Sequence, residues 1–202
     1  METQIKSLLN LDEIIKKDND NKVLDLKSLA ESIMNEVCIF NGVHSYHPIE
    51  IEFYIYDKEH HADILVYPRD NKKAGDIFFH QSGIDICFNS SIKDGRFGGI
   101  LIRSVEREDG KQFGGPLISK DEILNSAIQK CIVQESPKGF MNKISKITQR
   151  KGFKGPKGSK DIYWNKEYRF VSDNVKKPIT RTEQQLDPDT GEIINKDIKC
   201  YL

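Results

Sequence analysis

Two carboxylates and two tyrosines alternate along one stretch of the chain, residues 49–56, which reads IEIEFYIY. In a β-strand successive side chains point to opposite faces, so the isoleucines and Phe53 share one face. The other face then carries Glu50, Glu52, Tyr54 and Tyr56. Flat rings could stack on such tyrosines while a carboxylate holds a base or activates a water. The alternation is also typical of an ordinary exposed sheet face, and this strand alone leaves both interpretations open.

The elements that position this strand follow from the pattern around it. Between Val37 and Val105 the hydrophobic period is two, in the segments VCIF, IEIEFYIY, DILVY, DIFFH, IDICFNS and GGILIRSVE. Strands this close in sequence leave no room for crossover helices, which favours an antiparallel or mixed sheet. The segment IYWNKEYRFV predicts one more core strand nearer the C-terminus.

Helical patterns flank the predicted strands. Apolar residues at helical spacing predict a helix from about Leu26 to Asn35. A second helix is predicted after the strands, where Ser119 and Glu122 have the spacing of a capping box. Its apolar stripe consists of Ile123, Leu124, Ala127, Ile128 and Cys131. The sequence therefore predicts an α+β fold in a single domain with a mostly antiparallel sheet.

Length and composition exclude several classes of protein. The chain has 202 residues, enough for one domain with a buried core. No apolar run approaches the roughly 18 residues of a membrane-spanning helix, and the first residues lack a signal-peptide pattern. The four cysteines lie far apart without a CxxC pair, which argues against a thiolate zinc site. We expect a cytoplasmic protein without membrane contact, in which residues 1–22 are an N-terminal extension, 23–182 the domain and 183–202 a C-terminal tail.

Positive charge gathers in one segment although the whole chain is neutral, with 31 basic and 31 acidic residues. Residues 138–160 contain eight lysines and arginines and no acidic residue. A local basic face of this kind suits contact with phosphates whatever the total charge. A solvated lysine-rich loop is the other interpretation, and composition does not choose between the two.

Three motifs follow one another along the chain. Residues 50–54 read EIEFY, residues 83–89 read GIDICFN, and residues 100–106 read ILIRSVE. These segments resemble the E-x-E-A-Y, G-x-x-x-C-x-N and V-L-L-R-A-x-E motifs of the alkyladenine (3-methyladenine) DNA glycosylases. The resemblance covers roughly residues 26–180 and implies the fold of that family, a curved, mostly antiparallel β-sheet flanked by helices.

The resemblance also implies an activity. Enzymes of this family flip a damaged purine out of double-stranded DNA and hydrolyse its N-glycosidic bond. Glu52 matches the carboxylate that orients and deprotonates the attacking water, and Arg103 matches the arginine that helps to hold both. The resemblance implies neither a metal nor another cofactor, and we expect a monomer whose partner is double-stranded DNA with a damaged purine.

Residues that bind the substrate are implied on the same grounds. Tyr54 matches one stacking wall of the base pocket, and Phe79 takes the place of the second stacking tyrosine without its hydroxyl. Asn89 matches the amide that screens purine substituents. The family's pocket histidine falls on Asp63 here, and a short loop deletion would bring His61 to that place. For contacts with DNA phosphates we expect three lysines of the basic segment, Lys151, Lys154 and Lys157.

The chain departs from the family where the duplex would be held. Ser82 stands where the family inserts a tyrosine, and serine is too small to fill the space that a flipped base vacates. Gln81 and Ile84 are nearby substitutes. No segment matches the G-P-x-K-L phosphate contact of the family beyond the partial candidates at residues 115–116 and 155–156. A relative that binds nucleic acid or a nucleobase without cleaving it is therefore an alternative.

A metal-dependent hydrolase is a second alternative. Four histidines, at positions 44, 47, 60 and 61, lie near Glu50 and Glu52 in the sequence. Neutral imidazoles together with a carboxylate suit zinc. No HExxH or comparable spacing is present, and adjacent histidines rarely bind one ion together, so we do not expect a metal.

Overall fold

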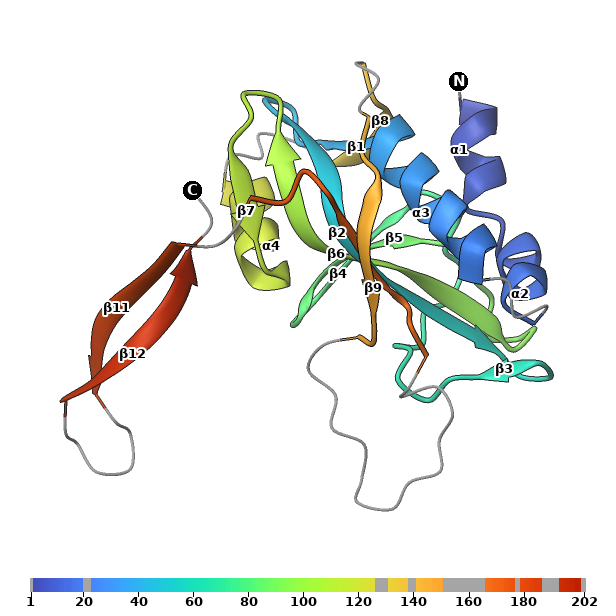
Figure 1. The fold of residues 1–202 in the computed structure, drawn as a ribbon. Helices are drawn as coiled ribbons and strands as arrows, with labels where there is room; N and C mark the ends of the chain where they lie inside the picture. The colour runs from blue at the N-terminus through green and yellow to red at the C-terminus, as the bar shows by residue number, and fades with distance from the viewer. Residues whose placement is uncertain are drawn as a thin grey trace.

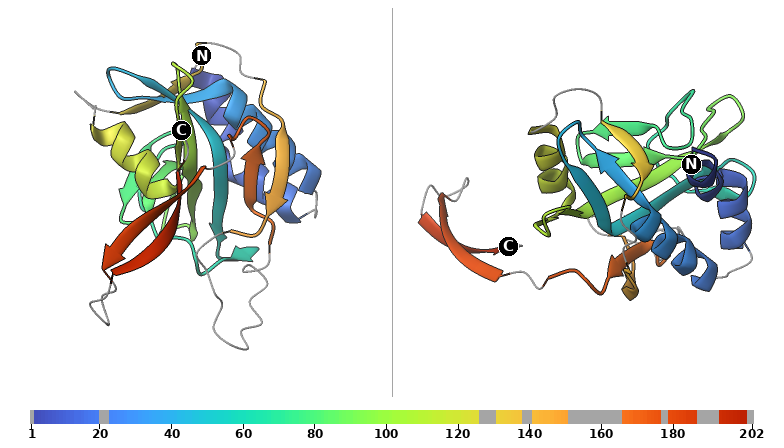
Figure 2. Two further views of the ribbon diagram at one scale, coloured as in Figure 1. Left: turned by 60° about the vertical axis from the view of Figure 1, so that its left-hand side comes forward. Right: turned by 90° about the horizontal axis from the view of Figure 1, so that it is seen from above.

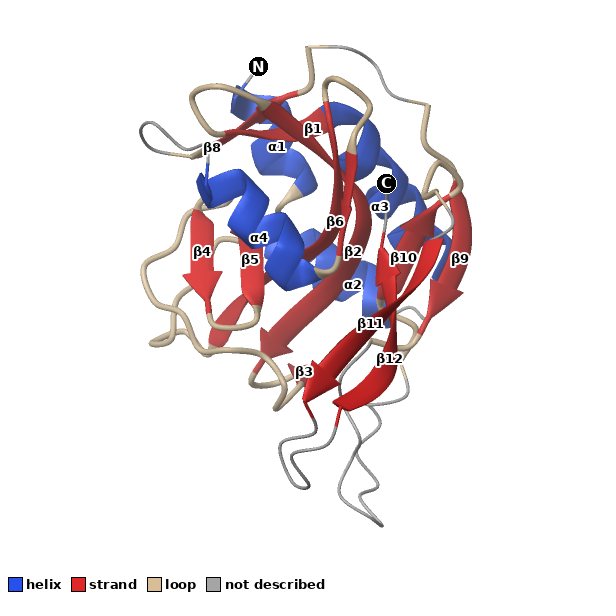
Figure 3. Cartoon of the chain, turned by 90° about the vertical axis from the view of Figure 1, so that its left-hand side faces the viewer, coloured by secondary structure: helices blue, strands red, loops and turns tan. Residues whose placement is uncertain are grey.

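The structure of the chain is a computed structural model that describes residues 2–19, 23–125, 131–137, 141–150, 166–176, 179–186 and 193–200. Most of the strands in these residues form one strongly curved antiparallel sheet (Figures 1 and 2). Helices lie against the sheet and do not alternate with its strands (Figure 3). The predicted α+β class with a curved, mostly antiparallel sheet is therefore confirmed.

The main sheet has the strand order β4-β5-β6-β2-β1-β8, with β10 joining β2 to β9, β3 at one end of β2, and β7 beside β6. The strands are β1 (Val37–Phe40), β2 (Ser45–Asp57), β3 (His61–Ala62), β4 (Ile77–His80), β5 (Gly83–Cys87), β6 (Arg96–Arg107), β7 (Gln112–Gly114), β8 (Ile132–Glu135), β9 (Ile144–Thr148) and β10 (Arg169–Ser172). The two long strands β2 and β6 pair along their whole length. The strand with the alternating carboxylates thus lies in the middle of the sheet.

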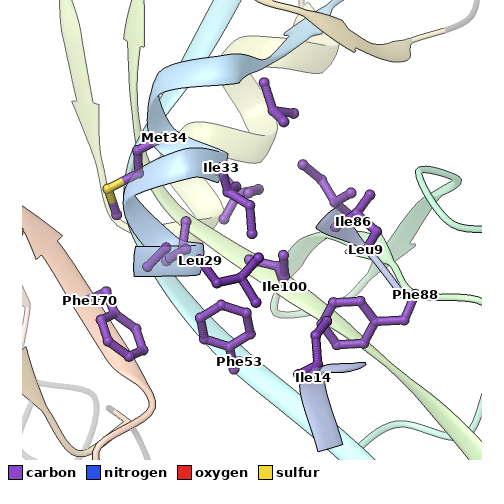
Figure 4. Close-up of a cluster of buried hydrophobic side chains, with 14 of the residues drawn as sticks. Leu9, Ile14, Leu29, Ile33, Met34, Phe53, Ile86, Phe88, Ile100 and Phe170 are labelled. Carbon is purple, nitrogen blue, oxygen red and sulfur yellow. The ribbon is translucent and has the colours of Figure 1, made fainter. Parts of the chain in front are cut away.

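Three helices at the N-terminus pack on one face of this sheet: α1 (Glu2–Leu8), α2 (Leu11–Asn19) and α3 (Val23–Glu36). The helix predicted at residues 26–35 is confirmed as α3, which begins a few residues earlier. Residues expected to form an N-terminal extension contribute buried side chains to the core, among them Leu9 and Ile14. Figure 4 shows both in the same cluster of buried side chains as Leu29 of α3 and Phe53 of β2. The first helices are therefore part of the domain.

The fourth helix, α4 (Pro116–Asn125), packs beside β5, β6 and β7. It begins three residues before the predicted capping box, because Gly115 has a positive φ of 99° and Pro116 suits a first helical position. Ser119 lies inside the helix, where its hydroxyl donates to the carbonyl of Phe113 at 3.1 Å. Of the predicted apolar stripe, Ile123 is buried, Leu124 is 41% exposed and Cys131 is buried beyond the helix.

One predicted strand is a loop. The segment DILVY, residues 63–67, follows the two-residue strand β3 as a turn. Asp63 accepts the backbone N–H of Leu65 at 3.0 Å, a side-chain contact that competes with strand pairing. Leu65 and Tyr67 of this loop line the pocket of the candidate site, together with Pro116 and Leu117 of α4.

Near the C-terminus, β11 (Ile179–Leu186) and β12 (Ile193–Cys200) form a separate antiparallel hairpin (Figure 1). The expected tail boundary at residue 183 falls within β11. No helix among the described residues is long and apolar enough to cross a membrane.

Candidate active site

Both faces of β2 are buried, including the one that carries the carboxylates. The relative exposure is 4% for Glu50, 0% for Glu52 and 8% for Tyr54. The interpretation of this strand as an ordinary exposed sheet face is therefore wrong. A buried charge is costly unless it is paired and hydrogen-bonded, so the partners of these side chains decide what the face can do.

Arg103 is aimed at the two carboxylates by an irregularity in the pairing of β2 with β6. Glu50 pairs with Ser104 and Ile51 pairs with Ile102, so Arg103 is the extra residue of a bulge. Its Nε lies 3.0 Å from Glu50 Oε1, and its Nη1 lies 3.1 Å from Glu52 Oε1. One guanidinium thus bridges both carboxylates, which keeps their spacing fixed.

Glu50 anchors this cluster from behind. Arg169 of β10 donates its Nε to Glu50 Oε1 at 2.6 Å, and the Ser104 hydroxyl donates to Oε2 at 2.8 Å. Burial alone raises the pKa of Glu50, but Arg169, Ser104 and Arg103 together hold that pKa below its usual value. Glu50 is therefore an ionised carboxylate at neutral pH that holds Arg103 in place.

Tyr54 closes the other side of Glu52. Its hydroxyl donates to Glu52 Oε2 at 3.0 Å, and burial together with the charge of Glu52 raises the pKa of Tyr54 far above its usual value. The hydroxyl therefore stays protonated and keeps donating. Arg150 lies over the Tyr54 ring, 4.6 Å from its centroid, and is itself paired with buried Asp63 at 2.7 Å.

A pocket of about 590 Å³ opens beside this cluster, within the range of roughly 300–1,000 Å³ that is usual for small-molecule sites. Tyr54 and Arg103 form part of its wall, whereas Glu52 lies behind them. The other lining residues are Leu65, Tyr67, Arg69, His80, Gln81, Ser82, Asp85, Leu101, Pro116 and Leu117. The pocket is therefore apolar and aromatic with a few fixed charged groups.

The pocket wall contains a second buried network, built by Arg69 of the loop before β4, His80 of β4 and Asp85 of β5. Arg69 Nη2 lies 2.8 Å from Asp85 Oδ2, and His80 Nε2 lies 3.1 Å from Asp85 Oδ1. Gly99 makes room for the arginine, because a Cβ there would lie 2.6 Å from Arg69 Nη1. The His80 ring packs against that of Tyr67, with centroids 5.1 Å apart.

No sequence pattern singled out Arg69, His80 or Asp85 as site residues. Asp85 interrupts an otherwise apolar strand, which was an available signal for a buried polar group. Arg69 follows the segment at residues 63–67 that was expected to be a strand, and no pattern indicated its position.

Of the predicted site residues, Glu52, Tyr54 and Arg103 meet, and three others lie elsewhere. Asn89 is exposed and accepts the backbone N–H of Leu11 at 3.1 Å, at the first residue of α2. Phe79 is 45% exposed and does not line the pocket, because alternation along β4 turns the next residue, His80, toward it. His61 is buried with its Nε2 3.3 Å from the Tyr168 hydroxyl and likewise does not line the pocket.

The residues considered for duplex contact also have definite places. Ser82 and Gln81 line the pocket and are exposed, whereas Ile84 is buried in the core and cannot enter a duplex. The predicted phosphate contacts Lys151, Lys154 and Lys157 lie outside the described residues.

The histidines that suggested a metal site have separate partners. His44 pairs with Glu108 at 2.6 Å, His60 with Asp57 at 3.0 Å, and His61 with Tyr168. Burial lowers the pKa of His47 to about 4. In the parts of the chain that the structure describes, no group of three or more His, Cys, Asp or Glu side chains is arranged to hold a metal ion.

The site combines a pocket that can hold a ring with the carboxylate of Glu52, which lies directly behind the lining residues Tyr54 and Arg103. A ring ligand would contact Tyr54 and Arg103, the two residues that bind Glu52. Comparisons with protein-family models, with curated proteins and with solved structures give no match to this chain.

Proposed function

We propose that the chain is a monofunctional DNA glycosylase that hydrolyses the N-glycosidic bond of an alkylated or deaminated purine. The observation that carries this proposal is the meeting of Glu52 with Arg103 and Tyr54, which line one pocket of suitable size. The resemblance assigns activation of the attacking water to Glu52, the holding of that water and carboxylate to Arg103, and one stacking wall of the base pocket to Tyr54. The curved antiparallel sheet is also the architecture that the resemblance implies.

In this proposal the damaged base leaves the duplex and enters the pocket, where it packs between Tyr54 and the opposite wall. Extrusion costs a few kcal/mol and comes first, because a stacked base is out of reach. Glu52 then takes a proton from a water that attacks the sugar carbon, while the carboxylate stabilises the positive charge that develops on the sugar. Arg103, held by Glu50, positions Glu52 throughout.

Water must reach Glu52 for this reaction, and Glu52 is fully buried in the free protein. Tyr54 and Arg103, which bind Glu52 and line the pocket, are 8% exposed and 12% exposed at the side chain, respectively. Binding of a base would shift Tyr54 and exchange its hydrogen bond to Glu52 for one from water. Catalytic contacts often become complete only when the substrate is bound.

The burial of Glu52 also favours a second candidate, a relative that binds a nucleobase or nucleic acid without hydrolysis. In that case Glu52, Arg103 and Tyr54 form a structural cluster, and the pocket retains recognition alone. Ser82, which lacks the bulk of a wedge, is consistent with this candidate.

One assay separates the two candidates. Duplexes carrying hypoxanthine, ethenoadenine or 7-methylguanine are incubated with the wild-type chain and the Glu52→Gln variant, then treated with alkali. Hydrolysis predicts strand breaks with the wild type and none with Glu52→Gln, which keeps the shape of the side chain and stays folded. Glu59→Gln, at an exposed carboxylate just after β2, is the matched control and should cleave like the wild type. Band shifts without breaks in every case would contradict the glycosylase and support binding alone.

Contact with DNA phosphates is testable through salt. Replacing Lys151, Lys154 and Lys157 by alanine should weaken binding to all duplexes, damaged or not. It should also reduce the slope of log K against log salt concentration by about 3, since each phosphate contact contributes about 0.9. An unchanged slope would remove these lysines from the interface.

A further inference from the structure

A second pocket, which shares no lining residue with the candidate site, lies where the curved sheet ends. It has a volume of about 500 Å³ and is lined by residues 131–135, residues 74–77, and Ile5 and Lys6 of α1. The first segment contains β8, the strand at one end of the sheet, and the second leads into β4, the strand at the other end. The pocket therefore lies between the two ends of the sheet.

This pocket follows the edge of β8 and does not lie over one of its faces. Successive side chains of a strand point to opposite faces, so a pocket over one face would contact alternate residues. Here every residue from Cys131 to Glu135 lines the pocket. One edge of β8 is paired with β1, and among the described residues β8 pairs with no other strand. The pocket therefore lies along the other, unpaired edge of β8, and we call it the β8 groove.

The pairing with β1 shows which backbone groups of β8 face the groove. The amide of Ser136 donates to the carbonyl of Glu36 at 2.8 Å. In the same register Gln134 comes two residues earlier and Val133 three residues earlier. Hydrogen-bonded and non-hydrogen-bonded pairs alternate along an antiparallel ladder, so Gln134 exchanges hydrogen bonds with β1 and Val133 does not. The N–H and C=O of Val133 therefore point toward the groove, where a further strand could bind them.

The hydrophobic core is incompletely covered at the β8 groove. Val133, Ala74 and Ile77 pack against the buried core cluster but stay partly exposed, and all three line the groove. Residues that pair across two strands have their side chains on the same face of the sheet. An apolar side chain placed opposite Val133 would therefore cover this part of the core.

The walls and charges of the groove indicate what kind of segment fits. Residues 74–77 form a second wall across from β8, so a single extended segment fits between the walls, whereas a sheet edge with further strands behind it would meet the second wall. The charged side chains of the lining are Asp76, Glu135 and Lys6. Two carboxylates against one ammonium favour a segment with basic residues.

We propose that the β8 groove binds an extended segment of a partner protein, which adds to the sheet as a strand beside β8. The segment carries apolar residues at alternate positions and basic residues at its ends. Hydrogen bonds with the backbone of Val133 hold the segment, and the uncovered core beside Val133 selects its apolar residues. This inference does not depend on the proposed hydrolysis, because the groove and the candidate site have no lining residue in common.

The test uses a fluorescent peptide, KTVTVTVK, in which valine alternates with threonine and a lysine stands at each end. Its Kd for the wild-type chain, measured by fluorescence anisotropy, should lie below about 100 μM. Val133→Pro should raise the Kd at least about tenfold, because it removes the N–H that faces the groove. The variant should stay folded, since the ladder with β1 takes no hydrogen bond from this N–H and proline is tolerated at such edge positions. Val43→Lys, at an exposed valine between β1 and β2, is the control and should bind like the wild type.

Two further variants test the second wall and the charge of the groove. Ala74→Lys places a cation across from β8 and should also weaken binding at least about tenfold, which keeps the test valid if the proline variant folds poorly. Lys6→Glu should strengthen binding about threefold, the usual size of one exposed charge contact.

Amide exchange locates the bound peptide. At a peptide concentration about ten times the Kd, exchange of the Val133 amide should slow about tenfold, because the peptide carbonyl covers it. The Gln134 amide, which already bonds to β1, should exchange at an unchanged rate.

Three results would overturn the proposal. A Kd above about 100 μM for the wild-type chain would show that the groove does not take such a segment. Equal binding by the wild type, Val133→Pro and Ala74→Lys would place the peptide elsewhere on the molecule. A wild-type dimer, measured by light scattering, that becomes a monomer in Val133→Pro would give the edge of β8 to a second copy of the chain.

Discussion

The two faces of β2 are both buried, but they are built in opposite ways. Phe53 points into the apolar core, where its ring lies between those of Phe88 and Phe170 with centroids 6.5 and 5.4 Å away (Figure 4). Its neighbour Tyr54 points the other way, into a layer of paired charges beside the pocket. One strand thus carries both the packing of the domain and the residues of its candidate site.

The difference between the faces shows where stability and chemistry reside. Apolar burial stabilises the fold without requiring exact geometry for each contact, whereas a buried ion pair often contributes little net stability. A layer of charges such as Glu50, Glu52, Arg103 and Arg169 is therefore better explained by positioning than by stability. Variants on the apolar face should therefore lower stability by an amount that does not depend on pH. Variants on the polar face should lower stability in a pH-dependent way or change base release.

The largest effect on stability is expected on the apolar face. Phe53→Ala should lower the free energy of unfolding by about 4 kcal/mol, because it opens a cavity among tightly packed rings. This loss, measured by urea denaturation, should be the same at neutral and mildly acidic pH. A loss below about 1 kcal/mol would mean that the core adapts to the cavity and that this face is less tightly packed than its contacts indicate.

On the polar face, Glu50→Gln should lower the free energy of unfolding by about 3 kcal/mol at neutral pH, since it removes the buried carboxylate that pairs with Arg169 and leaves Arg103 paired with Glu52 alone. The folded-state pKa of Glu50 lies below its unfolded value, so its contribution is present above the unfolded pKa. That contribution is lost as the pH falls through the folded pKa. The difference between wild type and variant should therefore shrink on acidification, and a difference independent of pH would show that the ionised form of Glu50 is not what stabilises the fold.

The smallest effect on stability is expected for Tyr54→Phe. This change removes one hydrogen bond to Glu52 and keeps the ring, so the free energy of unfolding should fall by about 1 kcal/mol. Base release should change more than stability, because the hydroxyl holds the carboxylate that activates water. A variant with wild-type release would place the tyrosine hydroxyl outside the mechanism.

The alternation in β2 and the closely spaced strands made the sheet and its class predictable from sequence. The burial of the carboxylate face was not predictable, because the loop at residues 63–69 and the ion partner Arg150 come from segments without periodic pattern. The α4 boundary was misplaced because a positive-φ glycine and a proline set the helix start, whereas the prediction followed a side-chain capping motif.

Within the candidate site, the order of the motifs along the chain was enough to predict that Glu52, Tyr54 and Arg103 lie together. The bulge that aims Arg103 is a register shift between β2 and β6, and no local residue type marks it. Asn89 and Phe79 were misplaced for a related reason. Asn89 lies just after the end of β5, and Phe79 lies within β4, where a shift of one residue reverses the face to which a side chain points.

If Glu52 activates the water that releases the base, replacing it should abolish release, whereas replacing its neighbour Glu50 should only reduce it. The free base liberated from a duplex carrying 7-methylguanine is quantified by mass spectrometry for the wild type, Glu52→Gln and Glu50→Gln. We expect release by the wild type, reduced release by Glu50→Gln because Arg103 is less firmly held, and none above background by Glu52→Gln. Equal release by the wild type and Glu52→Gln would contradict it.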